Sequence, residues 1–367
     1  MEYLDTGIKL ISKIKSLGYD AYLIGGCVRD YLLDIVSNDI DIATNMPLDT
    51  IKNNFKYKDN GSDYLSITIL FEGINFEITH FRKDISYADH RHPIVEEVDN
   101  LLVDTKRRDF TINALAFDSD KKIIDYHNGI NDLKNKLIRT IGNPNIRFEE
   151  DALRILRALY FSSKLGFEIE ENTLYAIKEK SYLLSSLSND RIFTYFIKLC
   201  EAKTSKGIDY IKEYDLFRYI PDFKNWLDVT GYGFIKEELV YRYYLKYDKY
   251  PPVITAKEKK LCLALKDLVI NNFDNYSLYK NKDSVYKLSS IIDRLNINSK
   301  QLKQKIMNMQ ISTDSDLAVS KLEITQGFIG EMKSAVVNEV IKAIVSDSIP
   351  NEREAIIRFI KRLKNAN

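Results

Sequence analysis

The sequence predicts an α+β protein in which a small N-terminal module of mixed strands and helices is followed by an all-helical array. Alternation of apolar and polar residues, the pattern of half-buried strands, is confined to residues 1–145. From Arg147 onward we find only helical periodicity, with breaks at scattered glycines and prolines. The 367 residues include 14 glycines and 7 prolines, few enough to favour long helices over a turn-rich β architecture.

The first elements of the module surround a pair of glycines. Residues 3–18 repeat apolar side chains at helical spacing and stop at Gly18, so we expect a helix there. Residues 21–24 predict a short strand. Gly25 and Gly26 follow this strand and open a second helix, where backbone N–H groups can approach a phosphate closely.

Further strands and a loop complete the module. Residues 39–43 alternate with a period of two and predict a strand. Residues 65–71 and 74–81 predict a hairpin that turns at residues 72–73. Residues 82–100 are polar and irregular, and we interpret them as a mobile loop.

Composition limits the possible classes of protein. Hydrophobic residues make up 45% of the chain and charged residues 29%, which is typical of a globular protein and argues against disorder. Lys and Arg number 54 against 53 Asp and Glu, so a uniformly cationic nucleic-acid coat is excluded, although a local basic patch is not.

The cellular compartment follows from three absences in the sequence. No apolar run reaches the roughly 18 residues that a membrane helix needs. The N-terminal helix lacks the features of a signal peptide. Cys27, Cys200 and Cys262 are far apart and form neither a disulfide framework nor a zinc motif. We therefore expect a cytoplasmic protein without membrane partners.

Acidic residues on the predicted strands are candidates for metal ligands. Asp39 and Asp41 lie two residues apart and project to the same face of a strand, an arrangement that suits a pair of divalent metal ions. Glu77, between Phe76 and Ile78, could bring a third carboxylate. The alternatives are two solvated aspartates on an edge strand and an ordinary outward-facing glutamate.

Basic residues cluster at Lys106, Arg107 and Arg108. Three adjacent cations suit neutralisation of a polyphosphate, and Asn113 could bond a ribose hydroxyl. The alternative is a solvated, charged surface.

Residues 150–157 form the third constellation. On a helix, Asp151 and Arg154 would be neighbours at i and i+3, either as a simple ion pair or as a reader of nucleobases. Cytosine and adenine both present an amino donor beside a ring-nitrogen acceptor, which matches an Asp acceptor beside an Arg donor. Uracil and guanine present the reverse pattern and would leave buried polar groups unpaired.

Together, these motifs closely resemble those of the class II tRNA nucleotidyltransferases, the CCA-adding members of the polymerase-β superfamily. The resemblance covers residues 20–200 well and is thin beyond them. It is carried, in this order, by residues 25–33 (GGCVRDYLL), 39–44 (DIDIAT), 107–115 (RRDFTINAL) and 150–158 (EDALRILRA).

The resemblance implies three parts of the chain. Residues 1–145 would be the polymerase-β-type catalytic head. Residues 146–205 would be a helical neck that carries the nucleotide-selecting EDxxR helix. Residues 206–367 would be an all-helical body and tail that bind the acceptor stem and elbow of tRNA.

The resemblance also implies the chemistry: template-independent addition of C, C and A to the tRNA 3′ end from CTP and ATP. Asp39 and Asp41 would hold two Mg²⁺ ions, with Glu77 as a further catalytic carboxylate. Residues 81–98, with Asp89 and Arg91, would be the flexible loop that accompanies addition of the final A. The nucleotide-binding residues would be Gly25, Gly26, Arg29, Arg108, Asp109, Asn113, Asp151, Arg154 and Arg157.

Departures from the family pattern and rival functions remain open. Tyr160 and His92 stand where the family usually has arginine. No histidine follows His127, so the HD phosphohydrolase domain of some relatives is excluded. The alternatives are a poly(A) polymerase, an enzyme that adds only the terminal A, and a non-catalytic RNA-binding relative. The sequence does not indicate an oligomeric state.

Overall fold

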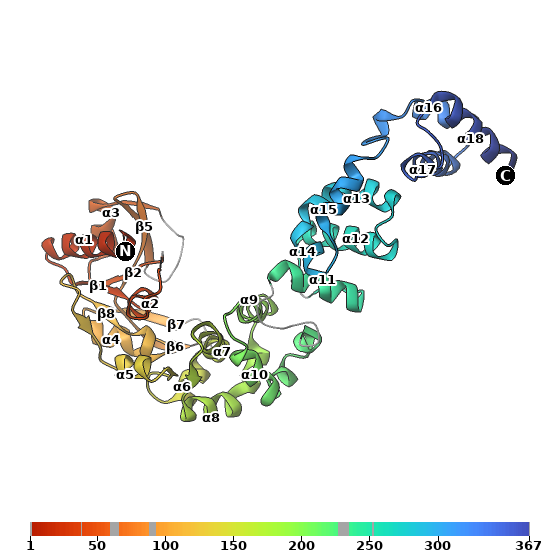
Figure 1. Ribbon diagram of the computed structural model, residues 1–367. Helices are drawn as coiled ribbons and strands as arrows, with labels where there is room; N and C mark the ends of the chain where they lie inside the picture. The colour runs from red at the N-terminus through yellow and green to blue at the C-terminus, as the bar shows by residue number, and fades with distance from the viewer. Residues whose placement is uncertain are drawn as a thin grey trace. The chain divides into compact units, whose positions relative to one another are not determined.

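The computed structural model describes residues 2–37, 39–58, 66–87, 93–226, 235–251 and 253–366 (Figure 1). The chain divides into two compact units, Met1–Phe234 and Ile235–Asn367. Asp89, Arg91 and His92 lie outside the described residues. The boundaries near residues 145 and 205 stay a prediction.

The first unit is built on a seven-stranded mixed sheet with the order β3-β4-β5-β2-β1-β8-β9. Strands β2 and β5 are parallel, with Asp41 opposite Glu77, and the other neighbours are antiparallel. The strands are β1 (Ala21–Ile24), β2 (Asp41–Thr44), β3 (Lys56–Lys58), β4 (Ser66–Phe71), β5 (Ile74–His80), β8 (Ala116–Phe117) and β9 (Ile123–Ile124).

Helix α1 (Glu2–Ser16) packs on this sheet and confirms the first predicted helix. Gly7 lies so close to the sheet that a Cβ there would be 3.1 Å from Leu23 Cδ2. Buried Leu10, Ile11 and Ile14 form the apolar stripe of the helix. The other helices of this region are α2 (Gly26–Leu32), α3 (Leu48–Asn54), α4 (Leu101–Lys106) and α5 (Gly129–Lys134).

The structure confirms the predicted hairpin and contradicts the predicted loop that follows it. The β4–β5 hairpin is confirmed, and Glu72 and Gly73 both have positive φ, as a tight hairpin turn requires. The prediction of an irregular loop over residues 82–100 is wrong, because β6 (Arg82–Tyr87) and β7 (Pro93–Glu97) pair as an antiparallel hairpin. Backbone pairing stabilises these strands, and their polar side chains give no clear period-two pattern.

The rest of the first unit is helical around α7 (Leu153–Leu165). Gly207 of α10 lies directly on α7, since a Cβ there would be 2.3 Å from the Leu159 carbonyl oxygen. One short parallel pair, β10 (Leu137–Ile138) with β11 (Glu168–Ile169), departs from the predicted all-helical pattern because two-residue strands are too short to show periodicity. The remaining helices are α6 (Pro144–Glu150), α8 (Glu171–Lys180), α9 (Asn189–Cys200) and α10 (Lys206–Glu213).

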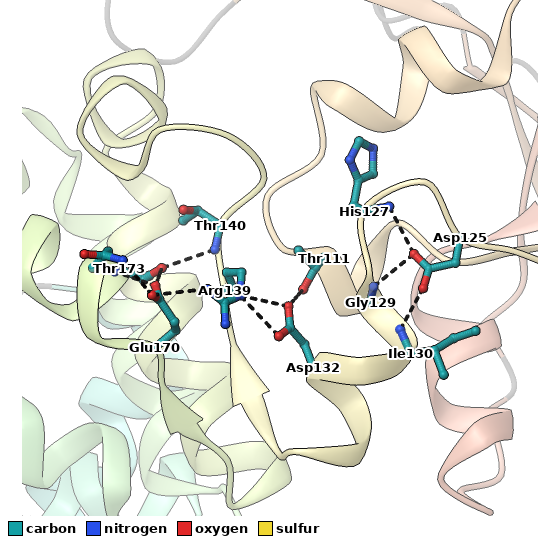
Figure 2. Close-up of polar contacts among 11 residues, drawn as sticks. Thr111, Asp125, His127, Gly129, Ile130, Asp132, Arg139, Thr140, Glu170 and Thr173 are labelled. Atoms are coloured by element: carbon teal, nitrogen blue, oxygen red, sulfur yellow. Dashed lines mark hydrogen bonds and ion pairs between the residues drawn. The ribbon is translucent and has the colours of Figure 1, made fainter.

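A polar network fastens the sheet region to these helices (Figure 2). Arg139 donates to Asp132 of α5 over 3.1 Å and approaches Glu170 to 3.2 Å. Thr111 donates to Asp132 over 2.7 Å, and Glu170 accepts the backbone N–H of Thr173 at the start of α8. The segment that carries Thr111 is thereby held against the helices that follow.

The second unit is all-helical, and the predicted α+β fold class is confirmed. Its last two long helices enclose a core that includes Val340, Ile344 and Ile356. No helix in the described part of the chain is both long and apolar enough to cross a membrane. The helices are α11 (Lys236–Tyr247), α12 (Ala256–Ile270), α13 (Asn275–Lys287), α14 (Ser289–Arg294), α15 (Ser299–Met307), α16 (Lys321–Ile324), α17 (Met332–Val345) and α18 (Arg353–Ala366).

Candidate active site

A cavity of about 460 Å³ lies in the first unit between the β1–α2 turn, the segment after α4, and α7. We call it the nucleotide cavity, after the ligand that the sequence analysis predicts for the residues that line it. Most of the sequence-predicted site residues line it, although they come from four separate stretches of the chain. They are Gly25, Gly26, Arg29, Asp39, Asp41, Arg108, Asp109, Asn113, Asp151, Arg154 and Arg157.

Gly25 brings the backbone close to two of the charged residues. Its φ of 86° lies in the region that glycine tolerates and other residues rarely adopt. A Cβ at this position would lie 3.4 Å from Arg108 Nη1 and 3.9 Å from Asp41 Oδ2. The first glycine of the pair is therefore required both for its backbone conformation and for the room that it leaves.

The paired aspartates stand at the start of β2. The strand begins at Asp41, and Asp39 lies just before it as an exposed residue. Burial and the charge of Asp39 raise the pKa of Asp41 to about 6; Glu77 adds to this, while Arg108 opposes it. An acid whose charged form is disfavoured in this way is suited to binding a cation.

The donor chemistry of Asp39 and Asp41 fits Mg²⁺. This ion is usually held by one or two carboxylates together with substrate phosphates and water. Among the described residues, no group of three or more His, Cys, Asp or Glu side chains is arranged to hold a metal ion. Glu77 faces Asp41 across the β2–β5 pair and lines a second cavity.

We predict that Asp41→Asn stabilises the metal-free protein. Because the folded-state pKa of Asp41, about 6, lies above the ordinary value of an aspartate, this group lowers stability as the pH rises from about 4 to about 6, and its full penalty is present at pH 8. Removing the charge should raise the free energy of unfolding by about 2 kcal/mol at pH 8 and by little at pH 4. Urea denaturation in EDTA at both pH values measures this, and equal effects at both would contradict the prediction.

Asp104 is a site residue that the sequence analysis missed. This fully buried carboxylate binds Arg107 Nη2 at 2.7 Å and Arg108 Nη2 at 3.2 Å. Burial alone would raise its pKa, but Arg108 and Arg107 lower it below the ordinary value. The spacing of i, i+3 and i+4 along a helix was the available signal. The two arginines are thus held in place, whereas Lys106 is exposed.

A relay of polar side chains connects the sheet region to α7. Arg29 donates to Asp30 over 2.6 Å and to Asn113 over 2.5 Å. Asn113 in turn donates to Asp109 over 3.1 Å, and Arg157 Nε donates to Asp109 over 2.6 Å. Burial raises the pKa of Asp109, but Arg157 and the hydrogen bonds lower it overall. Both groups of the Asn113 side-chain amide are therefore engaged within the protein.

The prediction of one continuous helix through residues 150–157 is wrong. Helix α6 ends at Glu150, Asp151 is extended with φ −146° and ψ 101°, and α7 begins at Leu153. Asp151 Oδ1 accepts the Leu153 backbone N–H at 3.0 Å, which explains the break, because an aspartate side chain competes with the helix for backbone donors.

Arg154 connects the end of α6 to the backbone of Arg107. It is 5% exposed, and it donates to the Arg147 carbonyl over 2.9 Å, to Glu150 over 2.8 Å and to the Arg107 carbonyl over 3.2 Å. Asp151 and Arg154 both line the nucleotide cavity, together with Tyr160. The arrangement therefore holds an acceptor and a donor at one wall of the cavity that contains the paired aspartates.

Comparison with protein families gives two matches. Residues 21–139 match the poly A polymerase head domain. Residues 166–227 match the domain described as the probable RNA and SrmB-binding site of polymerase A.

Individual relatives match almost the whole chain. CCA-adding enzymes of Ligilactobacillus salivarius and Lactobacillus johnsonii are 31% and 34% identical, over 97% and 98% of this chain and 96% and 97% of their own. The crystal structure of the Bacillus stearothermophilus CCA-adding enzyme in complex with CTP superposes with a TM-score of 0.82 at 26% identity, covering 100% of this chain and 98% of that one. The chain therefore belongs to the CCA-adding enzymes and is a nucleotidyltransferase of this family.

Proposed function

We propose that this enzyme adds C, C and A to the 3′ end of tRNA from CTP and ATP. The observation that supports this most is that one cavity contains the paired aspartates, the held arginines and the Asp151–Arg154 pair. The similarity to an enzyme crystallised with CTP agrees with a nucleoside triphosphate as its ligand.

In the proposed reaction, the 3′-hydroxyl oxygen of the acceptor forms a bond to the α-phosphorus of the triphosphate. The α–β phosphoanhydride bond breaks, pyrophosphate leaves with the electron pair, and the hydroxyl proton passes to solvent. Mg²⁺ held by Asp39 and Asp41 would lower the pKa of the attacking hydroxyl and stabilise the leaving pyrophosphate. Arg29 and Arg108 line the same cavity and would neutralise phosphate charge.

Glu77, the third carboxylate, would add its negative charge to that of Asp41 at the cation site. Its place opposite Asp41 in the β2–β5 register adds negative charge beside the cation site. This favours binding of Mg²⁺ over the empty, self-repelling site.

Asp151 and Arg154 would select the nucleobase of the incoming triphosphate. The Asp151 carboxylate caps Leu153 with one oxygen, but a carboxylate offers about four lone-pair sites and can accept a base amino group as well. Arg154 is held rigidly by two backbone carbonyls and Glu150. A fixed donor beside a fixed acceptor fits the edges of cytosine and adenine and not those of uracil and guanine.

The helical remainder, from residue 206 onward, would bind the acceptor stem and elbow of tRNA by shape and by phosphate contacts. Residues 81–98 would support addition of the final A. Strands β6 and β7 belong to that segment and pair with each other in antiparallel fashion.

The test uses the purified full chain and tRNA transcripts that end before the CCA, after C or after CC. Each is incubated with Mg²⁺ and one labelled nucleoside triphosphate. We expect two additions from CTP, then one from ATP, and none from UTP or GTP. Long A tails would indicate a poly(A) polymerase, addition of A alone would indicate an A-adding enzyme, and no addition would indicate an RNA-binding relative.

A further inference from the structure

Helix α7 contributes one wall of the nucleotide cavity. The residues of this helix that line the cavity recur three or four positions apart, so they share one face of the helix. Because an α-helix rises by about 1.5 Å per residue, this face extends over about 15 Å from the first of them to the last. They are Arg154, Arg157, Tyr160, Phe161 and Lys164. Lys164, the last of them, takes no part in the function proposed above.

The two ends of this wall differ in their chemistry. At the start of α7, Arg154 and Asp151 line the cavity as the pair proposed to select the base. At the other end, Lys164 Nζ lies 3.8 Å from Oδ2 of Asp30, which belongs to α2. A nucleoside triphosphate has its base and its phosphates at opposite ends. A base held at Arg154 would therefore leave the phosphates to extend toward Lys164.

The reacting phosphate would lie beside Asp41, close to the start of α2. Asp41 Oδ2 is 3.9 Å from the position that a Cβ of Gly25 would take, and Gly25 directly precedes α2. The two phosphates that leave as pyrophosphate are joined to the reacting phosphate on the side away from the base. They would thus continue along α2 toward Lys164, which approaches this helix at Asp30.

Lys164 adds positive charge at this end of the cavity. Arg29 is 2% exposed and donates to Asp30 Oδ1 from Nε over 2.8 Å and from Nη2 over 2.6 Å, so these two buried charges balance each other. Lys164 is held more loosely, because its 3.8 Å separation from Asp30 exceeds the length of an ordinary hydrogen bond. Its side chain is 35% exposed. The ammonium group can therefore contact an anion while Asp30 keeps it at the cavity wall.

Tyr160 gives a second reason to expect a working cation here. The family whose motifs this sequence resembles usually has arginine at this position, and a tyrosine removes that positive charge. The Tyr160 ring packs against Phe161 and edge-on against Tyr195, with centroids 5.3 and 6.1 Å apart. Lys164 follows four residues later, on the same face of α7 and in the same cavity. It is placed to restore the charge one helical turn away.

We infer that Lys164 binds the terminal phosphate of the incoming nucleoside triphosphate, and that it compensates for the tyrosine at position 160. This inference rests on the proposed function. It gives Lys164 a contact with the pyrophosphate that leaves in each addition, separate from the residues that select the base.

The test compares nucleotides that differ only in their phosphates. Lys164→Gln removes the cation and Lys164→Arg keeps it. Lys203→Gln is the matched control, because Lys203 is an exposed lysine whose charge acts on Lys164 from outside the nucleotide cavity. For each full-length variant we would measure the Kd for CTP, CDP and CMP with Mg²⁺ and without RNA, the KM for tRNA that lacks its CCA end, and the melting temperature.

We expect Lys164→Gln to raise the Kd for CTP by about tenfold, because a charge-assisted contact with the terminal phosphate is lost. The Kd values for CDP and CMP, which lack that phosphate, should stay within about twofold of the wild type, as should the KM for tRNA. Lys164→Arg and Lys203→Gln should bind CTP like the wild type. Adding Tyr160→Arg to Lys164→Gln should recover CTP affinity, since it returns a cation to the same face of α7.

Three results, each in a folded variant, would overturn the inference. If Lys164→Gln weakens binding of CTP, CDP and CMP to the same extent, the contact of Lys164 with Asp30 only holds α7 against α2. If it raises the KM for tRNA and leaves the Kd for CTP unchanged, Lys164 contacts the acceptor RNA. If it changes neither, Lys164 has no role in binding either substrate. A wild-type protein that binds CTP but adds no nucleotide to any transcript would instead contradict the proposed function.

Discussion

Asp39→Asn combined with Asp41→Asn is expected to reduce nucleotide addition by at least about 10³-fold, because several kcal/mol of transition-state stabilisation are lost and each 1.4 kcal/mol is tenfold in rate. Both side chains line the nucleotide cavity, and Asp41 is the more buried of the two. The measurement is incorporation of labelled CMP into tRNA that lacks its CCA end, at saturating CTP and Mg²⁺.

The control for this double substitution is Asp49→Asn, which removes an exposed carboxylate on α3. It should leave incorporation unchanged. The double variant should also lose the rise in melting temperature that Mg²⁺ gives to the wild type. Incorporation within about tenfold of the wild type, in a folded double variant, would show that these aspartates do not hold the catalytic metal ions.

Asp151→Asn is expected to lower the preference for CTP over UTP by about 100-fold, since it alters a hydrogen-bonding group in the lining of the nucleotide cavity that would discriminate between bases. An asparagine keeps an oxygen that can accept the Leu153 N–H, so the start of α7 is preserved. It also adds donors, which pair with the carbonyl oxygen of uracil. Single-turnover rates with CTP and UTP on the same acceptor give the ratio.

Glu149→Gln is the matched control for Asp151→Asn, because Glu149 is a nearby carboxylate that pairs with Lys180 outside the nucleotide cavity. It should not alter base preference. If Asp151→Asn slows CTP and UTP to the same extent and leaves their ratio unchanged, Asp151 supports the helix start and does not read the base.

Some elements were predictable because their causes are local. The β4–β5 hairpin follows from period-two patterning around a two-residue turn, in which Gly73 readily adopts the positive φ that the turn needs. Helix α1 follows from its apolar stripe and the glycine after it. In the same way, β1 followed by Gly25 identified the turn that opens onto the nucleotide cavity.

Other features were missed because they depend on a distant partner or on side-chain geometry that no residue pattern shows. The spacing of Arg107 and Arg108 from Asp104 was visible in the sequence, but the approach of the Arg82 backbone to the same carboxylate was not. The break at Asp151 was hidden because apolar spacing continues through it, while the side-chain cap that causes it is a detail of local geometry. The β6–β7 hairpin was hidden because backbone hydrogen bonds between polar strands leave no pattern of hydrophobicity.

The amino-acid order is enough to show which chemical groups the protein has: glycines after a strand, two aspartates at i and i+2, a pair of arginines, and an aspartate and an arginine three residues apart. It does not show that these groups share one cavity, or that Asp41 borders a second one; the folded chain does. Local patterns follow from backbone periodicity, whereas a site assembled from residues more than a hundred positions apart depends on how the sheet, α4 and α7 pack together.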